Sequence, residues 1–150
     1  MSAEHYLRPE FTRMLADHLL LGSSINLSGA HGQGRRRTLK DIYQTLPASV
    51  HIHQFDFRRD HSDPLSWLEA CDFNSDQTLL VLHNFNELEP GKKSQPFLDR
   101  LIKLCNQQNI SLLCITESEE QNALKLKSFQ LPPLSSPSDR GSPSSCKPLE

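Results

Sequence analysis

The sequence predicts a three-layer α/β/α domain with a mainly parallel central sheet of about five strands. Two observations lead to this prediction. Short apolar runs alternate with segments of helical periodicity, and two of the runs, TLLVL and ISLLCI, are almost entirely apolar. Such runs are typical of strands buried on both faces of a parallel sheet covered by helices. The chain of 150 residues is long enough for one domain with a substantial core.

The elements are predicted from periodicity and from the residues that end helices and strands. In the first helix the apolar side chains recur with a period near 3.6, and Gly22 ends it. In the third helix, Asp63 is the expected N-cap and Pro64 the first helical residue. The expected helices are 9–21, 35–46, 64–71 and 96–107. The expected strands are 24–28, 50–57, 78–82, 110–115 and 129–131.

The chain divides into three predicted regions: an N-terminal helix at 1–22, the core domain at 23–131 and a tail at 132–150. The tail holds five of the ten prolines, is rich in serine and has few large apolar residues. It cannot bury enough apolar surface to order itself, so we expect it to be disordered.

Composition narrows the function classes. The net charge of -2 provides no general attraction to nucleic acid or to an anionic membrane. The four cysteines form no CxxC pair and have no zinc-site spacing. The sequence shows no signal peptide and no apolar run of membrane-spanning length. We therefore expect a cytoplasmic protein.

The stretch INLSGAHGQGRRRTLK carries the strongest functional signal. It places a glycine-rich loop between a strand and a helix, as in the phosphate-binding pattern G-x-x-x-x-G-K-[ST]. In such a loop, backbone N–H groups and the helix N-terminus hold phosphate. The candidate phosphate-binding residues are Gly29, Ala30, His31, Gly32, Gln33, Gly34, Arg35 and Arg36. The alternative is a glycine-rich turn that binds nothing.

Two positions of this pattern depart from its chemistry. Arg35 stands at the lysine position and keeps the charge on a bulkier, planar group. Arg36 stands where a hydroxyl would contact Mg²⁺, and it brings a cation instead. Thr38 has a hydroxyl, but two positions later, about 200° round the helix, so it should face elsewhere.

With TLLVLHNFNELE and ISLLCITE added to this loop, residues 22–117 resemble the P-loop ATPase core of bacterial AAA+ proteins and their STAND-like neighbours. The resemblance implies that His83 and Asn84 stand at the metal-binding and adjacent acidic positions of the Walker B motif. It also implies that Asn86 replaces a second acid, that Glu87 is the nearest remaining one, and that Thr116 matches the sensor-1 position. An imidazole is a poor ligand for Mg²⁺, which prefers hard oxygen ligands. The alternative for His83 is a histidine that caps a strand end and contacts no ligand.

The resemblance therefore implies a degenerate P-loop ATPase-like module for binding or assembly, with no catalytic residue and no metal site. Phosphoryl transfer depends on positioning and charge neutralisation, and three of its parts are altered. We expect ATP or ADP to bind weakly and Mg²⁺ to bind poorly. The tail stands where relatives continue into a helical lid, so we also expect no lid. The expected partner is a protein, such as an active ATPase or a larger assembly.

Two alternative functions remain at the level of sequence. One is a working ATP-binding protein or ATPase with atypical Walker motifs. The other is a nucleic-acid adaptor that uses the Arg35, Arg36 and Arg37 cluster, because consecutive arginines can contact phosphates. A metal site built from His51, His53 and His61 is less well supported than exposed histidines of a strand and loop.

Overall fold

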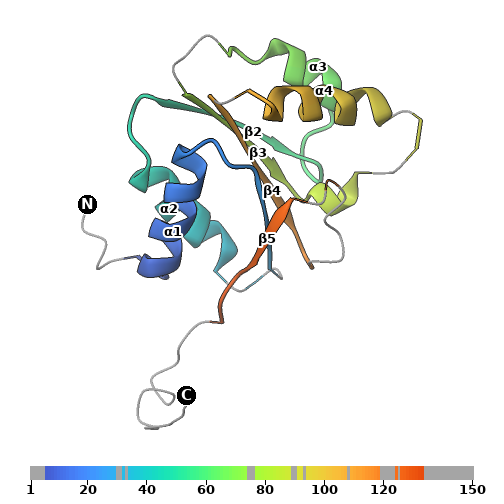
Figure 1. Cartoon of the computed structure of the whole chain (residues 1–150). Helices are drawn as coiled ribbons and strands as arrows, with labels where there is room; N and C mark the ends of the chain where they lie inside the picture. Colours follow the sequence, from blue (N-terminus) through green and yellow to red (C-terminus); the bar gives the residue numbers. More distant parts are fainter. Residues whose placement is uncertain are drawn as a thin grey trace, which may run out of the picture.

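A computed structural model shows an α/β domain built on one parallel sheet (Figure 1). It describes residues 6–29, 32, 34–73, 77–88, 91–92, 94–107, 109–118, 124 and 126–133. The five strands lie in the order β2-β3-β4-β1-β5. They are β1 (Ile25–Ser28), β2 (Val50–Asp56), β3 (Gln77–His83), β4 (Ile110–Thr116) and β5 (Lys127–Gln130). The helices are α1 (Pro9–Leu20), α2 (Arg35–Thr45), α3 (Pro64–Ala70) and α4 (Gln95–Cys105), with a 3-10 turn η2 (Phe85–Glu87).

The helices cover both faces of the sheet. Helices α1 and α2 lie on one face, and α3 and α4 lie on the other (Figure 1). Successive side chains of β3 alternate between the two layers, so that Leu79 and Val81 pack toward α1 and α2, and Leu80 and Leu82 toward α3 and α4. This alternation fixes which strand-end side chains can reach α2. The predicted three-layer fold with five strands is confirmed.

The local signals act as expected at the helix starts. The side chain of Asp63 accepts a hydrogen bond from the backbone N–H of Ser66, and Pro64 is the first residue of α3. Gly34 precedes α2 with φ 76°, in the left-handed region that glycine adopts without strain. The helix therefore begins at Arg35, directly after the glycine-rich loop.

The last strand lies earlier than predicted. It spans Lys127–Gln130 instead of 129–131. This strand is short and lies at the edge of the sheet, where half-exposed side chains leave a weak apolar pattern. Leu131 comes after the strand, and its side chain is buried against the α1 and α2 layer.

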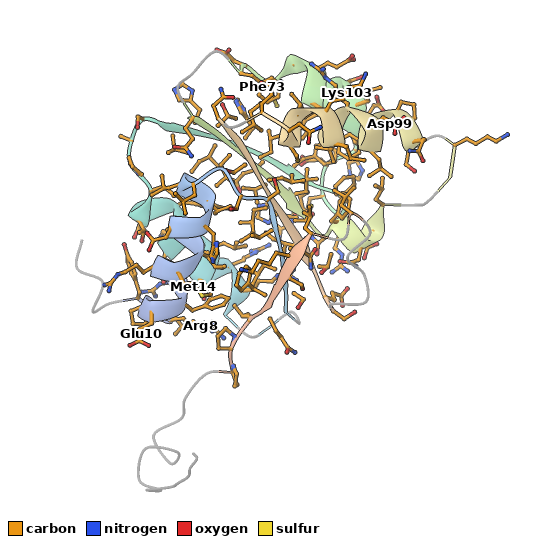
Figure 2. The ribbon with its side chains drawn as sticks, in the orientation of Figure 1. Arg8, Glu10, Met14, Phe73, Asp99 and Lys103 are labelled. Atoms are coloured by element: carbon orange, nitrogen blue, oxygen red, sulfur yellow. The ribbon has the colours of Figure 1, made fainter. Side chains whose placement is uncertain are left out.

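The segment after β5 is joined to the start of the chain through one side chain. Arg8, just before α1, is 6% exposed, and its Nε donates to the carbonyl of Pro132 at 2.8 Å. Figure 2 shows Arg8 at the N-terminal end of α1, beside this segment. Pro132 was expected to begin a disordered tail, but its carbonyl belongs to the packed domain. Residues 134–150 of the predicted tail lie outside the described residues.

No described helix has the length and apolar character needed to cross a membrane.

Candidate functional site

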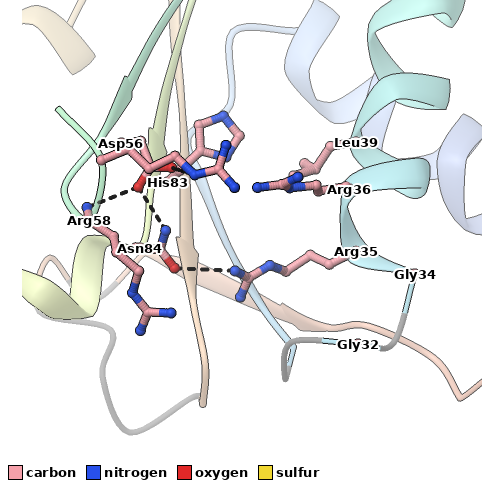
Figure 3. Close-up of a pocket in the computed structure, with 10 residues that line it drawn as sticks. Gly32, Gly34, Arg35, Arg36, Leu39, Asp56, Arg58, His83 and Asn84 are labelled. Atoms are coloured by element: carbon pink, nitrogen blue, oxygen red, sulfur yellow. Dashed lines mark hydrogen bonds and ion pairs between the residues drawn. The ribbon is translucent and has the colours of Figure 1, made fainter.

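A pocket lies at the carboxyl ends of β2 and β3, facing the start of α2 (Figure 3). Ligands of parallel α/β sheets bind at this edge, where loops leave the strands. The pocket has a volume of about 390 Å³. Its described lining residues are Gly32, Gly34, Arg35, Arg36, Leu39, Asp56, Arg58, Arg59, His83 and Asn84. Ala30, His31 and Gln33 of the predicted loop lie outside the described residues.

Arg35 links the loop to the end of β3. Its Nη1 donates to the carbonyl of Gly29 at 2.8 Å, and its Nη2 donates to Oδ1 of Asn84 at 3.2 Å. In Figure 3 the side chain extends from the start of α2 toward Asn84. Arg35 is 8% exposed, and burial lowers the pKa of its guanidinium, chiefly through desolvation. The residue at the lysine position therefore has protein partners as well as a place in the pocket.

Asn84 continues this link to β2. Its backbone has φ 55°, the left-handed region, which asparagine tolerates better than most residues. Its Nδ2 donates to Oδ1 of Asp56 at 2.7 Å (Figure 3). Arg35, Asn84 and Asp56 thus form a continuous polar chain across the pocket, which we call the Arg35 relay.

Asp56 is the one carboxylate among the described lining residues. Besides Asn84, its Oδ1 accepts from the backbone N–H of Arg58 at 2.9 Å. The described residues contain no group of three or more His, Cys, Asp or Glu side chains that could hold a metal. A divalent cation would therefore have to compete with the relay for one carboxylate, in a pocket lined by four arginines.

Arg58 is held from outside the pocket by acidic residues. Its Nη2 lies 2.8 Å from Oε2 of Glu87 and 3.6 Å from Oε1 of Glu117. The resemblance makes Glu87 the nearest remaining acid to the Walker B position, and in the structure its carboxylate pairs with Arg58. Arg59 is 67% exposed, and its Nε lies 3.9 Å from Oδ2 of Asp56.

His83 lies at the end of β3 and faces the α2 side of the sheet. Its Nε2 lies 2.8 Å from Oε1 of Gln54, and β2 places Asp56 opposite it in register. Burial lowers the pKa of His83; Arg35 and Arg36 lower it further, and Asp56 and Asp60 oppose them. The neutral imidazole is therefore favoured in this pocket.

Thr116 does not reach the pocket, although the resemblance placed it at a sensor position. Its side chain is fully buried, accepts from Nδ2 of Asn26 at 3.1 Å and donates to the carbonyl of Ser118 at 3.1 Å. Residues 112 and 114 of β4 face α3 and α4, so the pleat directs this side chain away from α2. Its backbone carbonyl does contact the loop, accepting from the N–H of Gly29 at 3.0 Å.

Of the three consecutive arginines, Arg35 and Arg36 line the pocket, and Arg37 is not among its described lining residues. Arg35 is buried, Arg36 lines the pocket, and Arg37 is exposed and pairs with Asp41 across one helical turn at 3.2 Å. Helical residues are separated by about 100°, so the three side chains do not form one exposed cluster. Thr38 faces away from the pocket, as predicted, and accepts from Nη1 of Arg8 at 2.8 Å.

Sequence reasoning missed three residues of this site: Asp56, Arg58 and Arg59. Asp56 is the last residue of β2, and Arg58 and Arg59 lie in the turn after it. The rule that ligands sit at strand carboxyl ends would have found them if applied there. The strand VHIHQFD carries polar residues on both faces, so its end was hard to place.

No protein-family model matches the sequence, and no curated protein matches it. Solved structures show the same fold. The ORC1 protein of Aeropyrum pernix in complex with DNA is similar over 89% of this chain and 47% of its own, with 19% identity and a TM-score of 0.63. A chain of Drosophila ORC bound to DNA is similar over 82% of this chain and 42% of its own, with 14% identity and a TM-score of 0.59.

NtrX from Brucella abortus in complex with ATP is similar over 85% of this chain and 36% of its own, with 13% identity and a TM-score of 0.52. The chain thus spans less than half the length of each of these structures. It shares with them a P-loop NTPase-like α/β fold.

Proposed function

We infer that this protein is a degenerate P-loop module that binds phosphate groups or a protein partner and does not hydrolyse nucleotide. The proposal rests mainly on the Arg35 relay. The guanidinium at the lysine position bonds to the loop through Gly29 and to Asn84, which stands where the resemblance places an acid. A hydrolytic site needs a metal and a water-polarising group at this place.

The positions around the relay support the loss of turnover. Arg36 has no oxygen for a metal, and His83 is bonded to Gln54. Glu87 is paired with Arg58. Phosphoryl transfer needs all its parts in place together, so the combined changes should abolish the reaction and not only slow it.

A role in an assembly is supported by the structures that share the fold. One of them is a chain of Drosophila ORC bound to AT-rich DNA and Cdc6, which is similar to this chain with a TM-score of 0.54. We propose that this chain also works beside a protein partner, and an active ATPase is the leading candidate. The nucleic-acid alternative is less well supported, because Arg35, Arg36 and Arg37 do not form one exposed cluster.

The decisive test is steady-state turnover of ATP by the purified protein with Mg²⁺. We expect none above the rate of the Arg35→Ala variant, which serves as the control for contaminating ATPase. Turnover that disappears in Arg35→Ala would establish the alternative function, a working ATPase with atypical motifs.

A variant that restores the residues of the phosphate-loop and Walker B patterns tests whether these positions form one nucleotide site. We expect Arg35→Lys, Arg36→Thr and His83→Asp together to raise Mg²⁺-dependent ATP binding more than any single change. The three positions line one pocket, so their effects should couple, with interaction energies of about 0.5–3 kcal/mol. Calorimetric titrations of the single and triple variants with and without Mg²⁺ measure this coupling. Strictly additive effects would contradict a shared site.

A further inference from the structure

We propose that the pocket binds a metal-free triphosphate chain by its charge, with arginines taking the place of magnesium. The inference rests on the proposed function, because it assumes that the loop still binds phosphate without turning it over. It adds the chemical class of the ligand and two arginines outside the loop motif. The residues that carry it are Arg36 and Arg59, which line the pocket from two separate segments of the chain.

The arginines come from two separate segments. Arg35 and Arg36 begin α2, and Arg58 and Arg59 lie in the turn after β2. Figure 3 shows Arg35 and Arg36 directed from α2 across the pocket toward the strand ends. An anion between the two segments would therefore meet guanidinium groups from both sides. Guanidinium groups bind phosphate oxygens in a planar, two-point geometry.

The acidic groups nearby pair with Arg58 and Arg59, and the described residues show no ion pair to Arg36. Asp56 is the single carboxylate among the described lining residues and is engaged by Asn84 and by the backbone of Arg58. Glu87 and Glu117 pair with Arg58 and do not line the pocket. Arg59 is 67% exposed and lies 3.9 Å from Asp56, so it can turn toward an anion at little cost.

The pocket has few groups that could recognise a nucleobase. Among the described lining residues His83 has the one aromatic ring, which is bonded to Gln54, and Leu39 has the one sizeable apolar side chain. The pocket should therefore recognise a ligand mainly by the negative charge of its phosphates. A pocket of about 390 Å³ lies near the lower end of the roughly 300–1,000 Å³ range of ligand sites.

Magnesium should weaken this binding. A bound Mg²⁺ cancels two of the negative charges that the arginines would contact, and it adds a cation next to Arg36. The expected effect of Mg²⁺ on affinity is thus opposite to that in a metal-dependent nucleotide site, where the metal bridges phosphate and protein oxygens and strengthens binding.

The test is calorimetric titration of the full chain with tripolyphosphate, ATP and ADP, each in EDTA and in Mg²⁺. We expect tripolyphosphate and ATP to bind within about three-fold of each other, and Mg²⁺ to weaken both by roughly three-fold or more. We expect Arg36→Ala and Arg59→Ala each to lower the affinity for tripolyphosphate about ten-fold. The matched control is Arg37→Ala, which removes an exposed arginine of α2 that does not line the pocket and should change affinity less than about two-fold.

Several outcomes would overturn the inference. They are no measurable binding of tripolyphosphate, ATP binding more than about ten-fold tighter than tripolyphosphate, stronger binding with Mg²⁺, or equal losses in Arg37→Ala and Arg36→Ala. ATP turnover measured in the same samples separates the two proposals. No tripolyphosphate binding and no turnover would contradict only the inference, whereas turnover would contradict the proposed function.

Discussion

Arg35 stands where the phosphate-loop pattern has lysine, and its planar guanidinium makes contacts that a point charge would not. The guanidinium spans from the carbonyl of Gly29 to the side chain of Asn84 and so joins the two strand ends. Lysine has a compact ammonium group and could not keep both bonds in this planar arrangement. The relay therefore connects Gly29, at the end of β1, to Asn84, at the end of β3.

His83 is a second residue whose chemistry follows from its surroundings. Because burial lowers its pKa in the folded protein, the unfolded chain binds a proton more readily as pH falls through the ordinary value of 6.5. The stability that the neutral form contributes is therefore complete above this value and is lost on acidification. Asp56 and Asp60 reduce this effect, and Arg35 and Arg36 increase it.

This pH dependence can be measured on a variant without the imidazole. We expect the melting temperature to fall less in His83→Gln than in the natural protein between about pH 7.5 and about pH 5.5. The amide of glutamine cannot titrate, and it keeps a polar group near Gln54. The matched control is His61→Gln, at an exposed position after β2. If His83→Gln follows the natural protein at every pH, the histidine does not contribute to the acid sensitivity.

At the scale of elements, periodicity accounts for what could be predicted. The apolar runs of β3 and β4 and the spacing of α4 determine the sheet and its layers, so the fold was predictable. The site was harder to predict than the fold, because the direction of each side chain depends on the pleat of its strand or the phase of its helix. A shift of one residue along β4 would have turned Thr116 toward the α1 and α2 face of the sheet, and the phase of α2 separates Arg37 from Arg36.

Gly29 shows how an element boundary can require glycine for packing. A Cβ atom at this position would lie 2.9 Å from Cβ and 3.0 Å from Cδ2 of Leu131, where the chain leaves β5. The sequence predicted this glycine for phosphate binding. The structure adds a second reason, close approach between the end of β1 and Leu131.

A double-mutant cycle tests this packing. We expect Gly29→Ala to lower the free energy of unfolding by about 1–3 kcal/mol through overpacking. Leu131→Ala alone should cost about 2 kcal/mol or more, because its side chain is buried. The double variant should cost less than the sum, since the shortened side chain lets the segment move away from the new methyl group. Urea unfolding of all four proteins gives the coupling. Additive costs would rule out the contact with Cδ2 as the cause, because Leu131→Ala removes Cδ2 and keeps Cβ.

At the scale of the whole molecule, Arg8 joins three regions that are distant in sequence. Its Nε bonds to Pro132 after β5, and its Nη1 bonds to Thr38 of α2 at 2.8 Å. Nearby, the N–H of Leu7 donates to Oδ2 of Asp41 at 3.2 Å. These bonds attach α1 and the segment after β5 to α2, the helix that follows the glycine-rich loop, so residues 7–20 pack with the rest of the described domain.

Two truncations and a point change locate the true start of the tail. Removing residues 134–150 should leave the melting temperature unchanged, because the only large apolar side chains in this stretch of sequence are those of two leucines. Ending the chain after Leu131 should lower the free energy of unfolding by about 1.5–3 kcal/mol, because a buried arginine loses a carbonyl partner.

The variant Arg8→Ala should lower the free energy of unfolding by at least as much. It should also make the loss of Pro132 less harmful, since the two changes remove one shared bond. The control is Arg13→Ala, an exposed arginine of α1, with an expected change within about 0.5 kcal/mol. If both truncations melt at the same temperature, the bond to Pro132 contributes nothing, and the packed domain ends at Leu131.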